Sequence, residues 1–340
     1  MNGSGSKSPG PARDSTAAAP LPASRRFDAG EFVNRYGLVC AWMLLIAGFS
    51  IASPDIFMSW ANFTNIFGSQ AILVVLTMGM IAPLIVGEFD LSMAGLVSVC
   101  LMLIGVLNVQ HGWPIGWVVL AVVGVSVLVG AVNAFTIVRI GVNSLVATLG
   151  MGTLLMGAAY GISGLSIVGL ASELTAFART RVFGIQAAFY YGLALTIVWW
   201  YVQRWTPLGR NLLFTGANRQ VARLSGVPVD RLRAGSLMTS SLVSGFAAIL
   251  LAGVLGSADP SAASGFLLPP FAAAFLGATA ISPGRFNPWG AFIAVYFLVT
   301  GIVGLQILGF SGWIEQVFYG GALVLAVTLS RIAADRLRGS

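Results

Sequence analysis

The most informative segment of the chain covers residues 66–109 and reads IFGSQAILVVLTMGMIAPLIVGEFDLSMAGLVSVCLMLIGVLNV. It is almost entirely apolar, and its two acidic residues, Glu88 and Asp90, lie close together near its middle. A transmembrane helix needs about 20 apolar residues to cross a hydrocarbon layer about 30 Å thick. The segment is therefore long enough for two membrane-spanning helices, separated by a polar interruption at Glu88 and Asp90.

Apolar runs of the same kind continue on both sides of this segment. They predict an all-α fold, a polytopic integral membrane bundle of about ten transmembrane helices, some of them interrupted. Pro269 and Pro270 fall inside the eighth expected span, so we expect a kink or break there. The expected spans cover approximately residues 36–52, 64–86, 91–109, 115–138, 144–164, 188–203, 234–256, 266–281, 288–308 and 313–330.

The composition excludes an ordinary soluble protein. Only 9% of the 340 residues are charged and 57% are hydrophobic, whereas soluble domains carry about 25% charged residues. The net charge of +7 would suggest nucleic acid as a partner in a soluble protein. Here the basic residues lie at the termini and between the apolar runs, so membrane orientation explains them better and we expect no nucleic-acid partner.

The arginine positions predict the orientation and the domain limits. If both termini are cytoplasmic, all basic residues except Arg179 and Arg181 lie inside, as the positive-inside rule requires. Residues 1–30, rich in Ser, Ala, Pro and Gly, are expected to form a disordered cytoplasmic tail. Residues 31–332 then form the transmembrane domain, and residues 333–340 form a short cytoplasmic tail.

Residues 204–233 are the only long cytoplasmic segment expected between spans. Asn218 can cap a short helix over residues 219–224, and Ser225-Gly226 can end it. This loop is either an ordinary solvated connector or a docking element for a cytoplasmic partner.

The expected short helix has two chemically different sides. Val221, Ala222 and Leu224 offer a small apolar face, while Arg219 and Arg223 lie four residues apart on the polar side. We expect a bulky charged residue at position 222 to clash with a docked partner without disturbing the membrane bundle.

No catalytic arrangement of residues is visible. The chain lacks a GxxxxGK[ST] motif and its one lysine, Lys7, lies in the N-terminal tail, so it cannot bind ATP through a P-loop. The cysteine and histidine spacings indicate no metal site. We therefore expect neither a metal nor a cofactor, and no enzymatic activity.

The polar residues at membrane depth are the candidates for a transport pathway. Ionisable groups there are costly and usually functional. Glu88 and Asp90 would line a pathway if they lie at a broken helix, or would simply belong to a tight turn at the inner boundary. Other polar residues in or beside spans are explained equally by interhelical hydrogen bonds; they are Ser92, Asn133, Asn143 and Thr148.

Several motifs resemble one known family. Residues 87–92, Gly-Glu-Phe-Asp-Leu-Ser, resemble the Gly-Gly-x-Asp-Leu-Ser signature of permease subunits of monosaccharide ABC importers, the ribose, xylose and arabinose type. Thr148-Leu149-Gly150 resembles their Thr-Leu-Gly-Met segment. Residues 216–227 resemble their coupling segment, Gly-x-Asn-x-x-Ala-Ala-x-x-Ser-Gly-Ile. The resemblance covers about residues 35–332 in the family's order.

The resemblance implies a homodimeric permease of the bacterial inner membrane, embedded in lipid. It would import a sugar delivered by an external substrate-binding protein. Cytoplasmic ATP-binding cassette ATPase subunits would dock on the coupling segment and hydrolyse ATP. Glu88 replaces the signature's second glycine, which leaves the particular sugar open. The residues carried over to ATPase docking are Gly216, Asn218, Arg219, Ala222, Arg223, Ser225 and Gly226.

Other functions are compatible with parts of the pattern. An ion-coupled secondary transporter would use Glu88 and Asp90 as coupling carboxylates, but it needs no ATPase dock. A related ABC permease for amino acids or nucleosides would share the architecture. A membrane-embedded enzyme or structural protein is the third class. The coupling segment and the scarcity of carboxylates within the spans favour the importer.

Overall fold

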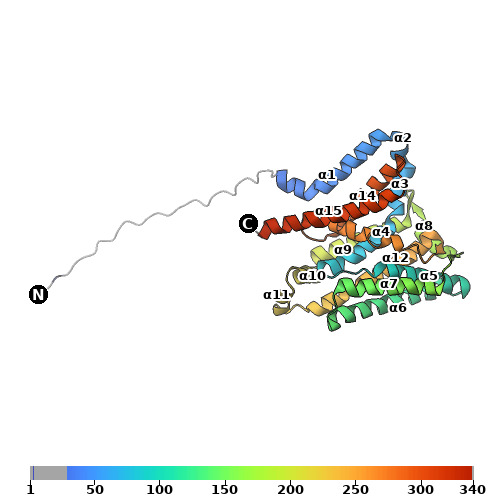
Figure 1. The fold of residues 1–340 in the computed structure, drawn as a ribbon, viewed down its shortest axis with the longest axis horizontal. Helices are drawn as coiled ribbons and strands as arrows, with labels where there is room; N and C mark the ends of the chain where they lie inside the picture. The colour runs from blue at the N-terminus through green and yellow to red at the C-terminus, as the bar shows by residue number, and fades with distance from the viewer. Residues whose placement is uncertain (1–2, 4–28, 339–340) are drawn as a thin grey trace.

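The structure is a computed structural model, and it describes residue 3 and residues 29–338. Its long helices lie roughly side by side in a bundle (Figure 1). The predicted disordered tail falls almost wholly outside the described residues. The predicted C-terminal tail begins inside the last helix, which continues to Arg338.

In the part of the chain that the structure describes, the first half of the bundle contains helices and connecting segments but no strands. Two of its helices end in π-helical turns, called η1 and η2. In chain order its elements are α1 Ala29–Ala52, α2 Pro54–Phe57, α3 Trp60–Ser69, α4 Ala71–Ile85, α5 Met93–Gly105, η1 Val106–Gln110, α6 Ile115–Ala134, η2 Phe135–Ile140 and α7 Ser144–Ile162.

The second half adds two pairs of very short strands. Strand β1 pairs with β4 in antiparallel register, with Ile167 opposite Ala258, and β2 pairs with β3. The elements are β1 Ile167–Val168, α8 Ser172–Arg179, β2 Arg181–Val182, β3 Ile185–Gln186, α9 Ala187–Trp205, α10 Pro207–Ala217, α11 Arg219–Leu224, α12 Val229–Leu255, β4 Ser257–Ala258, the 3-10 turn η3 Ser264–Phe266, α13 Pro269–Gly277, α14 Pro288–Ile307 and α15 Trp313–Arg338.

Every one of the ten predicted spans coincides with a helix, which confirms the all-α polytopic fold. Seven helical segments of the described chain are long and apolar enough to cross a membrane. The other three are α9, which is rich in tyrosine and tryptophan, and two shorter apolar segments in the α13 and α15 regions. The seven are Arg35–Ala52, Trp60–Ile85, Met93–Gln110, Ile115–Ile140, Ser144–Ile162, Val229–Leu255 and Pro288–Ile307.

The eighth predicted span is broken, but its prolines do not kink a longer helix. Pro269 and Pro270 occupy the first positions of α13, where proline loses no helical hydrogen bond. The helix then ends early, at Gly277. Asn287 holds the following turn: its Nδ2 donates to the carbonyls of Gly277 and Ala280, and its Oδ1 accepts from the Gly290 amide that begins α14.

Helix α4 lies at the centre of the bundle. All fifteen of its residues are buried, as expected for a helix that is apolar on every side. It packs against α12, α9, α13 and α14. The short break that follows α4 starts from this central helix, and its two acidic residues, Glu88 and Asp90, are buried.

Close approach of two helices beside this centre depends on glycine. A Cβ atom at Gly95 of α5 would lie 2.3 Å from the carbonyl oxygen of Gly152 of α7. No side chain fits at that distance, so the two backbones touch directly, as small residues allow within membranes.

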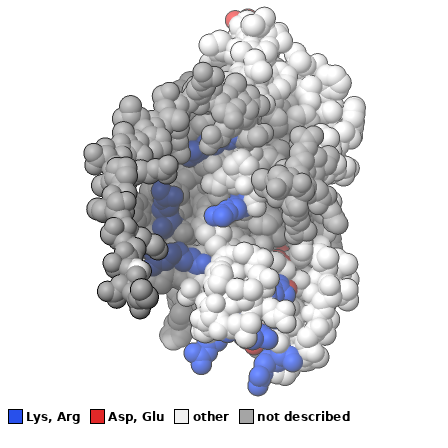
Figure 2. All heavy atoms as spheres, turned by 90° about the vertical axis from the view of Figure 1, so that its left-hand side faces the viewer, with Lys and Arg blue, Asp and Glu red and all other residues white. Residues whose placement is uncertain are grey.

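The two ends of the bundle differ in their elements. Figure 1 places the start of α1, the α10–α11 segment and the end of α15 at one end, which we call the α11 end. Helices α2, α3 and α8 lie at the other, which we call the α8 end. Figure 2 looks onto the α11 end and shows basic side chains spread over it.

The glycine contact between α5 and α7 predicts a packing defect on substitution. Gly95→Ala should lower the midpoint of thermal unfolding in detergent, because overpacking costs about 1–3 kcal/mol. Gly157→Ala is the matched control on α7, since a Cβ there meets no atom within 4 Å. Equal midpoints for the two variants would show that α5 and α7 do not require this close approach.

Candidate functional site

The site is built around residues 86–92, the non-helical break between α4 and α5. Helix α4 ends at Ile85 and α5 begins at Met93. Gly87 has a φ of +76°, a left-handed conformation that suits glycine. The Glu88 amide closes the turn by donating to the Pro83 carbonyl at 2.9 Å. The break thus leaves further backbone groups in need of partners.

Helix α7 supplies those partners through two hydroxyl groups. The Phe89 amide donates to Ser144 Oγ at 3.2 Å, and the Leu91 amide donates to Thr148 Oγ1 at 3.0 Å. Buried amide groups are almost always paired. Ser144 and Thr148 lie four residues apart, on one face of α7. Together they accept hydrogen bonds from two amides of the break and so stabilise its non-helical conformation.

Asp90 is the most deeply buried acid of the break, with no exposed surface. Its Oδ1 accepts from the Ser92 amide at 3.0 Å and from the Ser92 hydroxyl at 2.5 Å. Asn133 of α6 donates to Ser92 Oγ at 2.9 Å. Asp90 Oδ2 has no hydrogen-bond partner at normal distance among the described groups, and the Ser240 hydroxyl of α12 is the polar group that lies beside this carboxylate. A single buried oxygen is thus left available inside the bundle.

Glu88 is paired with two arginines, one from α11 and one from the start of α12. Its Oε1 accepts from Arg219 Nη2 and from Arg233 Nε, each at 2.7 Å, while its side chain is only 4% exposed. The Arg219 guanidinium also donates to the Val86 and Gly87 carbonyls, at 2.8 and 3.0 Å. We call this group of Glu88, Arg219 and Arg233 the Glu88 clamp. It joins the break to α11 and to α12.

The clamp changes the interpretation of two predicted residues. Glu88, a candidate pathway acid, is neutralised by the coupling segment. Arg219 was expected on the polar side of the short helix, yet it faces the break. Arg223 does lie outward and pairs with the exposed Asp230 at 2.7 Å.

The short helix itself forms as predicted. It covers Arg219–Leu224, and the Asn218 side chain caps it by accepting from the Gln220 and Val221 amides at 3.0 and 3.1 Å. Ser225 follows its last residue and Gly226 adopts a φ of +81°, so the predicted end is also confirmed.

The apolar face of α11 is not the one expected. Ala222 is fully buried within the chain itself, whereas Val221 is 47% and Leu224 is 87% exposed. The prediction that a large residue at position 222 would spare the bundle is therefore wrong. A helix of six residues has a face determined by its neighbours, and here Ala222 is the small residue that fits against them.

Gly216 brings the coupling segment close to the end of α4. A Cβ atom at this position would lie 1.8 Å from the carbonyl oxygen of Ile85. The last turn of α10 and the last turn of α4 therefore touch through backbone atoms. Together with the clamp, this contact joins α10 and α11 directly to the end of α4 and to the break.

The structure brings together most of the predicted residues, but not all. Asp90, Ser92 and Asn133 form one hydrogen-bonded chain, and Thr148 supports the same break. Asn143 is exposed and caps α7 by accepting from the Leu145 amide. Sequence reasoning missed Ser144, Arg233 and Ser240. The spacing of Ser144 and Thr148 was a usable signal, whereas nothing local points from Arg233 to Glu88.

The side chains that the structure describes form no metal site. Among them, no group of three or more His, Cys, Asp or Glu side chains could hold a metal ion. The chemistry available at the break is hydrogen bonding and charge pairing.

Three known proteins resemble this chain over most of its length. The D-allose transport system permease protein AlsC of Escherichia coli is 28% identical over 307 residues, which is 90% of this chain and 94% of that protein. The L-arabinose ABC transporter permease protein AraH of Azospirillum brasilense is 28% identical over 334 residues, 94% of each chain. The autoinducer 2 import system permease protein LsrD of Yersinia enterocolitica is 30% identical over 271 residues, 78% of this chain and 81% of that protein.

No solved structure matches the chain. Residues 62–327 match the family described as branched-chain amino acid transport system / permease component. This range includes the break, the Glu88 clamp and α11, and the family is one of transport subunits rather than enzymes. The chain is a multi-pass membrane protein that belongs to this family of transport-system permease components.

Proposed function

We propose that this chain is the permease subunit of an ATP-binding cassette importer that carries a sugar. The observation that carries the proposal is the Glu88 clamp, which links a water-facing helix of the coupling segment to a helix break inside the bundle. A secondary carrier has no need of such a link, because no separate motor drives it. The named substrates of the relatives that match 94% of their own length, D-allose and L-arabinose, support a sugar.

The break forms part of the translocation path in this proposal. Sugars offer hydroxyl groups, and a carboxylate accepts hydrogen bonds from hydroxyls more strongly than a neutral group does. Asp90 has one buried oxygen without a partner among the described side chains, next to Ser240. Ser92 and Asn133 fix the other oxygen in place. Glu88 is already neutralised and acts in coupling instead.

A separate ATPase drives the break through α11. Val221 and Leu224 present an exposed apolar surface on a helix outside the membrane, and this surface inserts into a groove of the ATPase. Movement of α11 then pulls on Arg219, and through Glu88 and Arg233 on the break and α12. The contact between Gly216 and Ile85 transmits the same movement to the end of α4. Rigid elements of this kind are common in conformational switching.

The remaining partners follow from the orientation. The α11 end faces the cytoplasm, because the positive-inside rule places arginine-rich loops there. Both termini lie on that side, in the inner membrane of a bacterium. The α8 end then faces outward and receives a substrate-binding protein. Two copies of this permease pair around the path, surrounded by lipid.

Substitution of the exposed leucine of α11 tests the docking of the ATPase. Leu224→Glu should abolish co-purification of the ATPase and uptake of the sugar, because it places a charge in an apolar contact. Membrane insertion should stay normal, since Leu224 is 87% exposed. Leu165→Glu, at a position that is 80% exposed in the loop between α7 and α8, is the control and should keep the ATPase bound. Normal co-purification with Leu224→Glu would contradict the docking assignment.

Removal of the charge at position 88 tests the clamp. Breaking a buried ion pair costs about 3–5 kcal/mol, and Gln retains part of the hydrogen bonding, so Glu88→Gln should reduce uptake by at least about tenfold, equivalent to 1.4 kcal/mol. The ATPase should still bind. Arg139→Gln is the control, because Arg139 is exposed and takes part in none of the ion pairs that the structure describes. Equal uptake by the two variants would remove the clamp from the coupling mechanism.

Asp90→Asn tests the path itself. Asn can still accept the Ser92 hydrogen bonds, so folding and ATPase binding should be unchanged. Uptake should fall by about tenfold or more, because a charge-assisted hydrogen bond to the sugar is lost. Uptake of labelled sugar into vesicles measures the effect, with Asp55→Asn, the same change at an exposed position of α2, as a control that should transport normally. Full uptake by Asp90→Asn would assign Asp90 a structural role.

A further inference from the structure

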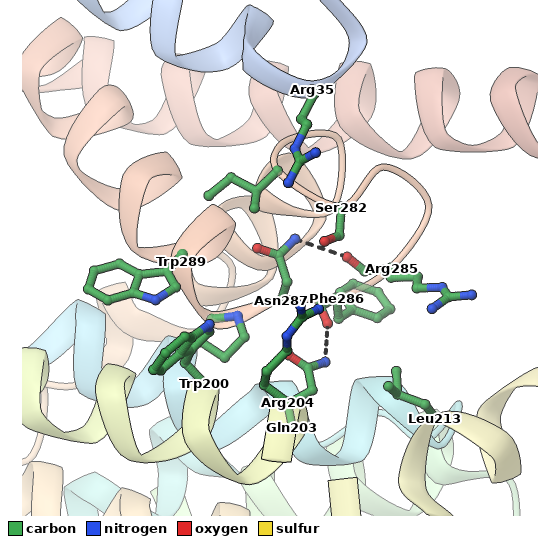
Figure 3. A pocket seen from close by; sticks show the side chains of 12 residues that line it. Arg35, Trp200, Gln203, Arg204, Leu213, Ser282, Arg285, Phe286, Asn287 and Trp289 are labelled. Atoms are coloured by element: carbon green, nitrogen blue, oxygen red, sulfur yellow. Dashed lines mark hydrogen bonds between the residues drawn. The ribbon is translucent and has the colours of Figure 1, made fainter. Parts of the chain in front are cut away.

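A cavity lined by several arginines lies at the α11 end, away from the break. It has a volume of about 430 Å³ and opens between α1, α9 and the loop that joins α13 to α14 (Figure 3). Six side chains define its character: Arg35, Arg204, Arg285, Gln203, Trp200 and Trp289. None of these residues takes part in the clamp or in the hydrogen bonds of the break.

The cavity concentrates positive charge. Arg35 comes from α1, Arg204 from the last turn of α9 and Arg285 from the α13–α14 loop. No acidic side chain is among the described residues that line the cavity, and none of the three arginines makes an ion pair with a side chain that the structure describes. Arginine stays charged at all ordinary pH values. Three arginines line one cavity and no acid is found among its described lining residues, an arrangement that suits an anionic occupant.

The loop that carries Arg285 is fastened in place from both sides. The Ile281 amide donates to the Arg35 carbonyl at 2.8 Å, and Gln203 Nε2 donates to the Phe286 carbonyl at 2.8 Å. Buried Asn287 also donates to the Arg285 carbonyl at 3.2 Å. Ile281 adopts a φ of +61°, which is costly for a β-branched residue. These hydrogen bonds hold the loop, and with it the backbone of Arg285, in a fixed position beside α1 and α9.

The walls of the cavity are aromatic and apolar. Trp200, Trp289 and Leu213 line it together with the arginines. Tryptophans gather where membrane spans meet the headgroup layer, and Trp200 lies near the end of α9, which ends at Trp205. A cavity with cationic heads and apolar walls at this depth fits a molecule that has both a phosphate and a hydrocarbon part.

We propose that this cavity binds the headgroup of an anionic phospholipid from the leaflet at the α11 end. Guanidinium groups bind phosphate oxygens through paired hydrogen bonds, and basic pockets between spans are suited to such headgroups. The volume is within the range of small-ligand sites, about 300–1,000 Å³. Free phosphate carries the same charge but has no apolar part that could contact the apolar walls.

The bound lipid gives α1 a further attachment to the bundle. Only 6% of the window Arg35–Ala52 is buried inside the chain, so α1 is held mainly by its contacts with α14. Arg35 lies outside the residues that match the family, 62–327. A phosphate shared by Arg35, Arg204 and Arg285 would connect α1 electrostatically to α9 and to the loop before α14. The lipid therefore acts as a structural ligand of the permease.

The test measures lipid binding to the purified full chain in neutral detergent. Cardiolipin is titrated while the thermal unfolding midpoint is recorded, and retained lipid is counted by native mass spectrometry. The pocket variant carries Arg204→Gln and Arg285→Gln. The control carries Arg139→Gln and Arg223→Gln, two exposed arginines outside the cavity, and so has the same net charge.

Cardiolipin should raise the midpoint of the wild type and the control, and phosphatidylcholine should not. The pocket variant should bind cardiolipin at least about tenfold more weakly, because two charge-assisted contacts are lost. If the double variant does not fold, Arg285→Gln alone, at an exposed loop position, serves in its place. Equal cardiolipin affinity in pocket and control variants would overturn the site. A midpoint shift of the same size with inorganic phosphate alone would overturn the lipid and assign a free anion.

Discussion

The buried carboxylate of Glu88, held by Arg219 and Arg233, is the contact on which the interior of this permease depends. A charge at this depth persists only when it is paired and hydrogen-bonded. Both arginines come from the segment that lies outside the membrane in the sequence-based topology. The helix break therefore cannot keep its conformation independently of that segment. Because α11 is anchored inward by Arg219, its outward surface is left to Val221 and Leu224.

The helices around this contact are closely packed, so they cannot deform easily. Helix α4 is buried on all sides, and glycine contacts bring α5 against α7 and α10 against α4 at backbone distance. Serine and threonine side chains of α7 take up the amides that the break frees. Packed interiors switch between discrete arrangements rather than bending gradually. Such a break is suited to two states, one for each position of α11.

Local signals in the sequence were sufficient for the spans, the interrupted helices and the cap of α11, because hydrophobic runs, prolines and Asn218 act over a few residues. They were insufficient for the pairing of Glu88, since its partners lie 131 and 145 residues away. They also misplaced Ala222, because six residues give too short a pattern to show which face is covered. Asp90, Ser92 and Asn133 were found as polar residues within spans, but only the fold shows that they form one chain.

Helix α1 has a consequence for the order in which the protein is assembled. Its Trp42 indole donates to the Thr300 hydroxyl at 2.9 Å, a contact between residues 258 positions apart. At a synthesis rate of about 5–20 residues per second, the partner follows roughly 13–50 s later. During that interval the first span cannot make this contact with α14. It must therefore be stable in the membrane before this contact forms. A helix that is apolar on most sides, and of which only 6% is buried inside the chain, meets that requirement.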